Sequence, residues 1–109
     1  MGKTPSTLSE AIGIIRATFP EAELAAWANR PMDEAVLDAH FALGAWIRNE
    51  WIFDEESQLV KRIRESTAYI HDDDVSSLIL EALWRVLNDE DCPSIERLLG
   101  FRYCGGDTA

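Results

Sequence analysis

The sequence predicts an all-α fold, a compact bundle of five to six helices in a single domain, on the basis of three observations. Apolar residues recur at helical spacing along most of the chain, and no segment alternates apolar and polar residues as a strand would. Residues that start and stop helices punctuate this pattern. The length of 109 residues and the hydrophobic content of 47% suit one core of ordinary size. We expect residues 1–100 to form this domain and residues 101–109, which include two adjacent glycines, to be a flexible C-terminal tail.

The first two predicted helices lie before residue 32. Thr7 and Glu10 form a capping box at the start of the first helix. Its apolar face consists of Leu8, Ile12, Ile15 and Phe19. Pro20 suits the first turn of the second helix, and Arg30-Pro31 ends it. The inward-facing residues of this second helix are Leu24 and Trp27.

A third and longer helix is expected from about Asp33 to Asn49. Its apolar stripe contains Leu37, Phe41, Gly44, Arg48 and Trp51, flanked by Val36, Leu43 and Ile47. Gly44 costs roughly 1 kcal/mol of helix propensity in mid-helix, so we expect it to allow a close crossing with another helix.

Three further helices are expected after a turn around Ile52 to Glu56. Leu59, Val60 and Ile63 mark the fourth. The fifth begins at an N-cap near Asp73 and stops near Asn88. Its apolar residues are Val75, Leu78, Ile79, Ala82, Leu83, Val86 and Leu87. Pro93 starts a short sixth helix through Leu99, with Gly100 as its C-cap.

Polar residues interrupt the apolar stripe of the third expected helix. His40, Gly44 and Arg48 lie four residues apart and so share a face. A buried arginine or histidine needs a partner, and the nearest supply of carboxylates is residues 72–74, at the start of the fifth expected helix. We therefore expect the two helices to cross at Gly44, with Arg48 or His40 reaching these carboxylates. We favour this structural network over an acid–base pair and expect no catalytic residue, because no serine or cysteine has a recognisable nucleophile spacing.

The sequence predicts neither a metal site nor a cofactor. The Asp72-Asp73-Asp74 run lacks the alternating oxygens, central glycine and distal glutamate of a calcium loop. His71 is a single imidazole, expected in an exposed loop. Cys92 and Cys104 are too far apart to indicate a chelating pair.

The charge of the chain narrows the possible partners. Twenty acidic residues against ten lysines and arginines give a formal net charge of −10, with runs at 54–56, 72–74 and 89–91. This argues against nucleic acid or an anionic membrane as the direct partner, because both bind basic surfaces. The longest apolar run is too short to span a bilayer, no signal-peptide pattern opens the chain, and two cysteines make no disulfide framework. We therefore expect a cytoplasmic protein.

Two motifs resemble a known family. Residues 40–51 read HFALGAWIRNEW, residues 70–80 read IHDDDVSSLIL, and residues 5–12 read PSTLSEAI. These segments resemble an uncharacterised bacterial domain-of-unknown-function family with the signature HFxLGxWIRNxW followed by HPDDMSxIIL. Asp72 and Val75 depart from the proline and methionine of that signature. The family brings no known activity; the resemblance implies a shared structural network of His40, Arg48, Asn49, Asp73, Asp74 and Ser76.

Our main functional hypothesis is a small, acidic, non-enzymatic protein that binds and inhibits a basic, nucleic-acid-binding protein. Anti-CRISPR proteins and immunity proteins have this size and charge. The alternatives are a housekeeping acidic helical domain whose charge serves solubility, and a small hydrolase-like enzyme that uses His40. Trp46 lies off the main apolar stripe and is the aromatic residue most suited to an interface. The expected partner-binding residues are Asp54, Glu55, Glu56, Asp72, Asp89, Glu90, Asp91 and Trp46.

Overall fold

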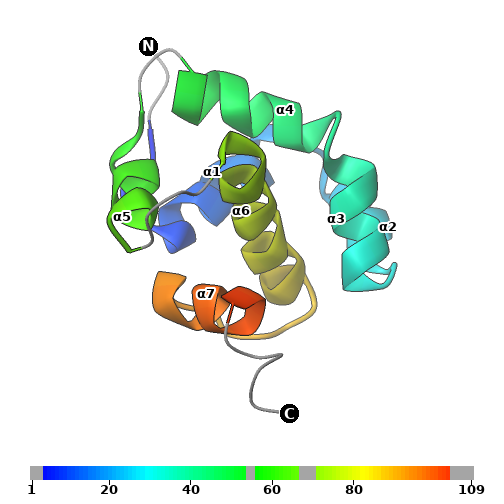
Figure 1. Cartoon of the computed structure of the whole chain (residues 1–109). Coiled ribbons are helices and arrows are strands. Elements are labelled where there is room, and N and C mark those ends of the chain that lie inside the picture. Colours follow the sequence, from blue (N-terminus) through cyan, green and yellow to red (C-terminus); the bar gives the residue numbers. More distant parts are fainter. Residues whose placement is uncertain (1–3, 54–55, 67–70, 104–109) are drawn as a thin grey trace.

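The computed structural model confirms the all-α fold (Figure 1). It describes residues 4–53, 56–66 and 71–103, and for residues 100–103 the backbone only. Within these ranges the helices are α1 (Leu8–Thr18), α2 (Glu21–Ala28), α3 (Met32–Ala39), α4 (Leu43–Arg48), the π-helix η1 (Asn49–Phe53), α5 (Gln58–Ser66), α6 (Asp72–Leu87) and α7 (Ile95–Tyr103). None of the helices in these ranges is long and apolar enough to cross a bilayer.

Helix α6 is the centre of the fold. It contacts α1, α2, α3 and α4, and Figure 1 shows it running through the middle of the molecule beneath α4. Its buried residues are Val75, Ser76, Leu78, Ile79, Leu80, Ala82 and Leu83. Each fully buried leucine, isoleucine or valine contributes about 1.5–3 kcal/mol, so α6 supplies much of the hydrophobic stabilisation.

The capping box of α1 is present, with one difference. The Thr7 hydroxyl accepts a hydrogen bond from the Glu10 N–H at 3.1 Å, as predicted. The Glu10 carboxylate reaches back to the N–H of Ser6, at 2.8 Å, and not to that of Thr7. Two backbone donors at the start of α1 are thereby satisfied.

Three hydrogen bonds fix the α2–α3 hairpin and attach it to α6. The indole N–H of Trp84 donates to the Arg30 carbonyl at 2.9 Å, and the Asn88 side chain donates to the Ala28 carbonyl at 3.0 Å. Within the hairpin, the Trp27 indole N–H donates to the Ala35 carbonyl at 2.6 Å. The turn between α2 and α3 therefore has a defined position on the bundle.

The prediction of one continuous helix over residues 33–49 is wrong. The chain breaks into α3 and α4 through a turn at residues 40–42, where the N–H groups of His40 and Ala42 bond three residues back. The guanidinium Nη2 of Arg48 donates to the His40 carbonyl at 3.0 Å, so a side chain satisfies a carbonyl that leaves the helix. No proline or glycine marks the break in the sequence.

The expected turn at residues 52–56 also differs, because the helix continues as η1 to Phe53. This π-helix buries the adjacent residues Trp51 and Ile52. Ser57 then begins α5: its N–H bonds to the Trp51 carbonyl at 2.9 Å, and its hydroxyl accepts from the Val60 N–H at 3.2 Å.

The boundaries of the last two helices also differ from the expected ones. Helix α6 begins at Asp72 after an extended His71, so Asp73 lies in its first turn and is not its N-cap. The hydroxyl of Ser94 accepts from the Arg97 N–H at 3.1 Å and starts α7, which continues through Gly100 to Tyr103. Residues 104–109 of the predicted tail lie outside the described residues.

Candidate functional site

The first candidate site is a polar junction between α4 and α6 built around Arg48. Its guanidinium Nη1 donates to the Ser76 hydroxyl at 3.0 Å, and Nη2 donates to the His40 carbonyl. Its Nε lies 3.7 Å from Oδ1 of Asp73. The predicted pairing of Arg48 with a carboxylate at the start of α6 is thus confirmed, and Arg48 is a buried residue.

Gly44 allows the close approach that the sequence predicts. A Cβ atom at this position would lie 3.2 Å from Nη1 of Arg48, 3.3 Å from the Ala39 carbonyl oxygen and 3.7 Å from Cδ1 of Leu80 on α6. The glycine therefore leaves room both for the guanidinium and for the packing of α4 against α6.

The polar groups of this junction bond to one another and join α4 to α6. Ser76 is fully buried, and its hydroxyl donates to the Asp73 carbonyl while it accepts from Arg48. Nε2 of His40 is 4.0 Å from Oδ2 of Asp73, beyond hydrogen-bond distance. Of the other expected members, Asp74 is half-buried in the first turn of α6, whereas Asn49 is exposed at the start of η1 and does not join the junction.

In a second polar cluster, Arg64 pairs with two of the acidic residues that were expected to bind a partner. Nε of Arg64 lies 2.8 Å from the Glu56 carboxylate, and its Nη2 lies 2.6 Å from that of Asp72. Burial lowers the pKa of Arg64, but hydrogen bonds and charge interactions with Asp72 and Glu56 outweigh this effect and raise its pKa above the ordinary value. Glu56 and Asp72 therefore join α5 to the start of α6 through Arg64, and their expected role in binding a partner stays a prediction. Asp54 and Glu55 lie outside the described residues.

The third acidic run forms an exposed loop between α6 and α7. Asp89 has a φ of 65°, a left-handed conformation that aspartate tolerates better than most residues. Glu90 pairs with Arg85 at 3.4 Å, whereas Asp89 and Asp91 have no ion-pair partner in the part of the chain that the structure describes. These two carboxylates are exposed to solvent, and their expected role in binding a partner stays a prediction.

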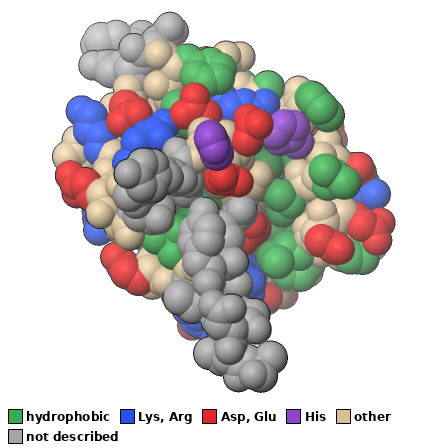
Figure 2. Space-filling view, in the orientation of Figure 1, with side chains coloured by type: hydrophobic (Ala, Val, Ile, Leu, Met, Phe, Trp, Pro, Cys, Tyr) green, Lys and Arg blue, Asp and Glu red, His purple; other side chains and the backbone are tan. Residues whose placement is uncertain are grey.

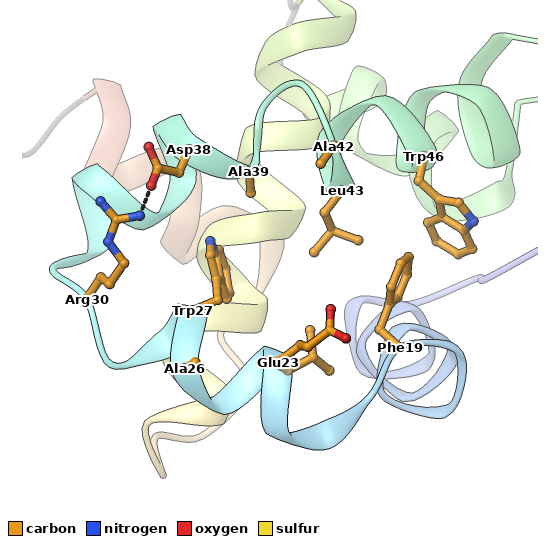
Figure 3. A pocket seen from close by; sticks show the side chains of 11 residues that line it. Phe19, Glu23, Ala26, Trp27, Arg30, Asp38, Ala39, Ala42, Leu43 and Trp46 are labelled. Carbon is orange, nitrogen blue, oxygen red and sulfur yellow. Dashed lines mark ion pairs between the residues drawn. The ribbon is translucent and has the colours of Figure 1, made fainter.

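The structure also contains an apolar groove that sequence reasoning missed. It lies between α2 and the α3–α4 segment and has a volume of about 640 Å³. Figure 3 shows an elongated site, with the Arg30–Asp38 ion pair at one end and Phe19 beside Trp46 at the other. Its larger apolar lining residues are Phe19, Leu24, Trp27, Leu43 and Trp46. The only early signal was the position of Trp46 off the main stripe.

The aromatic walls of the groove are held in place by their neighbours. The Trp46 ring makes edge-to-face contacts with Phe19 at 5.3 Å and with the buried Trp51 at 5.2 Å between centroids. The hydrogen bond of Trp27 to the Ala35 carbonyl fixes the other wall. Binding sites of this kind are largely preformed and avoid much of the entropy loss of ordering side chains.

Charged and apolar side chains surround the groove. Glu23 and Asp38 line it together with Arg30, which pairs with both Asp38 and Glu34. Leu37 and Phe41, which are next in sequence to the lining residues Asp38 and Ala42, are 72% and 84% exposed. Figure 2 shows acidic and hydrophobic side chains side by side over the α2–α3 side of the molecule.

The described residues offer no metal centre. They contain no group of three or more histidine, cysteine, aspartate or glutamate side chains placed to hold an ion. Cys92 is exposed, and partial burial of its thiol raises its pKa, which disfavours the reactive thiolate. Cys104 lies outside the described residues.

The chain belongs to an uncharacterised family. The model of the family described as "Domain of unknown function (DUF6794)" matches residues 4–87, which include α1 to α6 and both candidate sites. This confirms the resemblance found in the sequence. No curated protein and no solved structure matches the chain.

Proposed function

We propose that this member of the DUF6794 family is a non-enzymatic protein that binds a basic protein partner. The observation that carries the proposal is a set of exposed carboxylates that make no ion pair or hydrogen bond within the described part of the chain. They are Glu21, Glu23, Asp33, Glu50, Glu65, Asp89, Asp91 and Glu96. Such a surface attracts a cationic protein and accelerates its association.

The partner in this proposal is a nucleic-acid-binding protein, and binding inhibits it. The cationic groove of such a protein is shaped to receive phosphates, and a carboxylate-rich surface can take their place. The formal net charge of −10 opposes direct binding of nucleic acid, since both would be negative. In this scheme the protein acts as an anti-CRISPR or immunity protein acts, by occupying the surface that its target needs.

Two features of the polar junction favour binding over catalysis. The hydroxyl of Ser76 is buried and already engaged as both donor and acceptor. His40 Nε2 is not within hydrogen-bond distance of a nucleophile; its nearest ion-pair partner, Asp73, is 4.0 Å away. The groups that resemble an acid–base set instead hold the α3–α4 break against α6.

Capture from the native host, with identification of bound proteins and nucleic acids, tests the proposal directly. Binding of the captured partner is then measured for Asp89→Asn/Asp91→Asn and for Glu21→Gln/Glu23→Gln, with Arg16→Gln/Lys61→Gln as a control that makes the chain more acidic. We expect slower association for the acidic-to-neutral variants, no loss for the control, and a steep fall in affinity with salt.

Two results together would contradict the proposal that the carboxylates bind a basic partner. Neutral variants that bind as tightly as the parent, with affinity independent of salt, would favour the housekeeping domain whose charge serves solubility. The spread of the eight carboxylates over several helices is what that alternative predicts.

A further inference from the structure

We infer that the groove between α2 and the α3–α4 segment binds one apolar face of a basic amphipathic helix supplied by the partner. The inference deepens the proposed function and rests on it for the charge of the occupant. It names the site at which the partner helix contacts this protein. The exposed carboxylates by themselves indicate only that the protein prefers a cationic partner.

The shape and the lining of the groove fit a rod with an apolar stripe. Figure 3 shows Trp27 and Leu43 between its two ends, with Phe19 and Trp46 closing one of them. Apolar and aromatic side chains therefore follow the long axis of the site. An amphipathic helix presents apolar residues at i, i+3, i+4 and i+7 along such an axis.

The charge around the groove selects a basic helix. Residues 19–46 contain five acidic residues and one basic residue, Arg30, which is already paired with Glu34 and Asp38. Glu23 lines the groove and has no ion-pair partner among the described residues, so it is available to a lysine or arginine beside the apolar stripe. A second copy of this chain is a poor occupant, since each copy carries a formal charge of −10.

Exposed apolar residues extend the contact beyond the groove. Leu37 and Phe41 are adjacent in sequence to the lining residues Asp38 and Ala42, and both are more than two-thirds exposed. Large exposed apolar side chains beside a preformed pocket are typical of an interaction surface. Their burial against a helix wider than the groove would add to the contact area.

The probe is a synthetic peptide of leucine and lysine, about 18 residues long, with leucine at helical spacing. It is compared with a scrambled peptide of the same composition and with a peptide in which glutamate replaces lysine. Binding to the full chain is measured by calorimetry, and NMR follows the indole N–H signals of Trp27 and Trp46, with the amides of α5 as reference. We expect the Leu/Lys peptide alone to bind and to shift the two indole signals.

Two alanines on α2 provide a matched pair of variants. Ala26 and Ala25 are both exposed, but only Ala26 lines the groove. Each change to glutamate adds one negative charge to the same helix. Ala26→Glu should lower the affinity for the Leu/Lys peptide by at least about tenfold, because it places a carboxylate against the leucines of the peptide. Ala25→Glu should leave this affinity unchanged or slightly higher.

The outcomes separate this inference from the proposed function. Equal effects of the two variants, or equal binding of the scrambled peptide, would overturn the groove as the site and leave a general preference for cations intact. Equal binding of the Leu/Glu peptide would overturn the basic occupant of the groove, while the exposed carboxylates outside it would still be tested by partner capture. Failure of every peptide to bind would overturn the inference, while partner capture and its salt dependence would still judge the proposed function separately.

Discussion

Replacing Arg48 by methionine should destabilise the protein strongly, because it removes two hydrogen bonds of a buried side chain. Arg48 donates two hydrogen bonds at 3.0 Å, to the Ser76 hydroxyl and to the His40 carbonyl, from a side chain that is only 10% exposed. Methionine keeps much of the aliphatic packing but donates nothing. The variant thus removes the two bonds that tie the α3–α4 break to α6.

The expected loss of stability follows from those two hydrogen bonds and not from the ion pair between Arg48 and Asp73. Hydrogen bonds from a charged donor contribute about 1.5–3 kcal/mol each, so the loss of two of them in Arg48→Met should lower the free energy of unfolding by about 3–6 kcal/mol. Asp73 is 66% exposed, so water solvates its carboxylate when the arginine is removed. Asp73→Asn should therefore cost no more than about 1 kcal/mol, as for other surface pairs.

Urea unfolding of the two variants, of His40→Gln and of Arg62→Ala measures these differences. His40→Gln should change stability by less than about 1 kcal/mol, because Arg48 uses the backbone carbonyl of His40 and not its imidazole. Arg62 is exposed and makes one 3.3 Å bond to the Ser6 carbonyl, so Arg62→Ala should be nearly silent. For Arg48→Met the melting temperature should fall by more than about 10 °C.

One pattern of results would refute this reasoning. If Asp73→Asn destabilised the protein as much as Arg48→Met, the ion pair would be the dominant interaction and the carboxylate would behave as a buried charge. An unchanged melting temperature for Arg48→Met would show that the arginine is not a structural residue at all.

Two further predictions concern the same region. Gly44→Ala should destabilise the native protein, since a Cβ would press on Arg48 and on the Ala39 carbonyl, and Arg48→Met should relieve part of that cost in a double-mutant cycle of urea midpoints. Arg30→Gln should raise the affinity for the Leu/Lys peptide measured by calorimetry, because it leaves Asp38 unpaired beside the groove. An unchanged affinity would mean that this end of the groove does not contact the peptide.

The local pattern of the sequence was sufficient to predict the crossing of α4 and α6. Spacing by four residues placed Gly44 and Arg48 on one face, and the Asp72–Asp74 run was the nearest set of carboxylates. The central helix was equally predictable, since its apolar residues extend over four turns. The first feature depends on four-residue spacing within one helix and on a distinct carboxylate run further along the chain, and the second depends on one uninterrupted apolar pattern.

The break at residues 40–42 was not predictable from the same pattern. Its residues, His40, Phe41 and Ala42, include no helix breaker, and the turn exists because Arg48 caps a carbonyl eight residues earlier while bonding to α6. The groove depends on this break, so it was missed as well. The pairing of Arg64 with two carboxylates, each eight residues away in opposite directions, likewise follows from the docking of α5 and not from helical spacing.

The polar junction and the groove share the α3–α4 segment, and this affects how any loss of activity must be interpreted. Arg48 fixes the His40 carbonyl, and Ala39 and Ala42, which lie within two residues of His40, line the groove. A variant of Arg48 can therefore lose partner binding by moving a wall of the groove, with no chemistry involved. Only variants that leave the junction intact separate the two hypotheses. Ala26→Glu is such a variant, because it changes the groove from the α2 side: a folded Ala26→Glu protein that loses biological activity supports binding, whereas full activity in it combined with an inactive, folded His40→Gln protein supports catalysis.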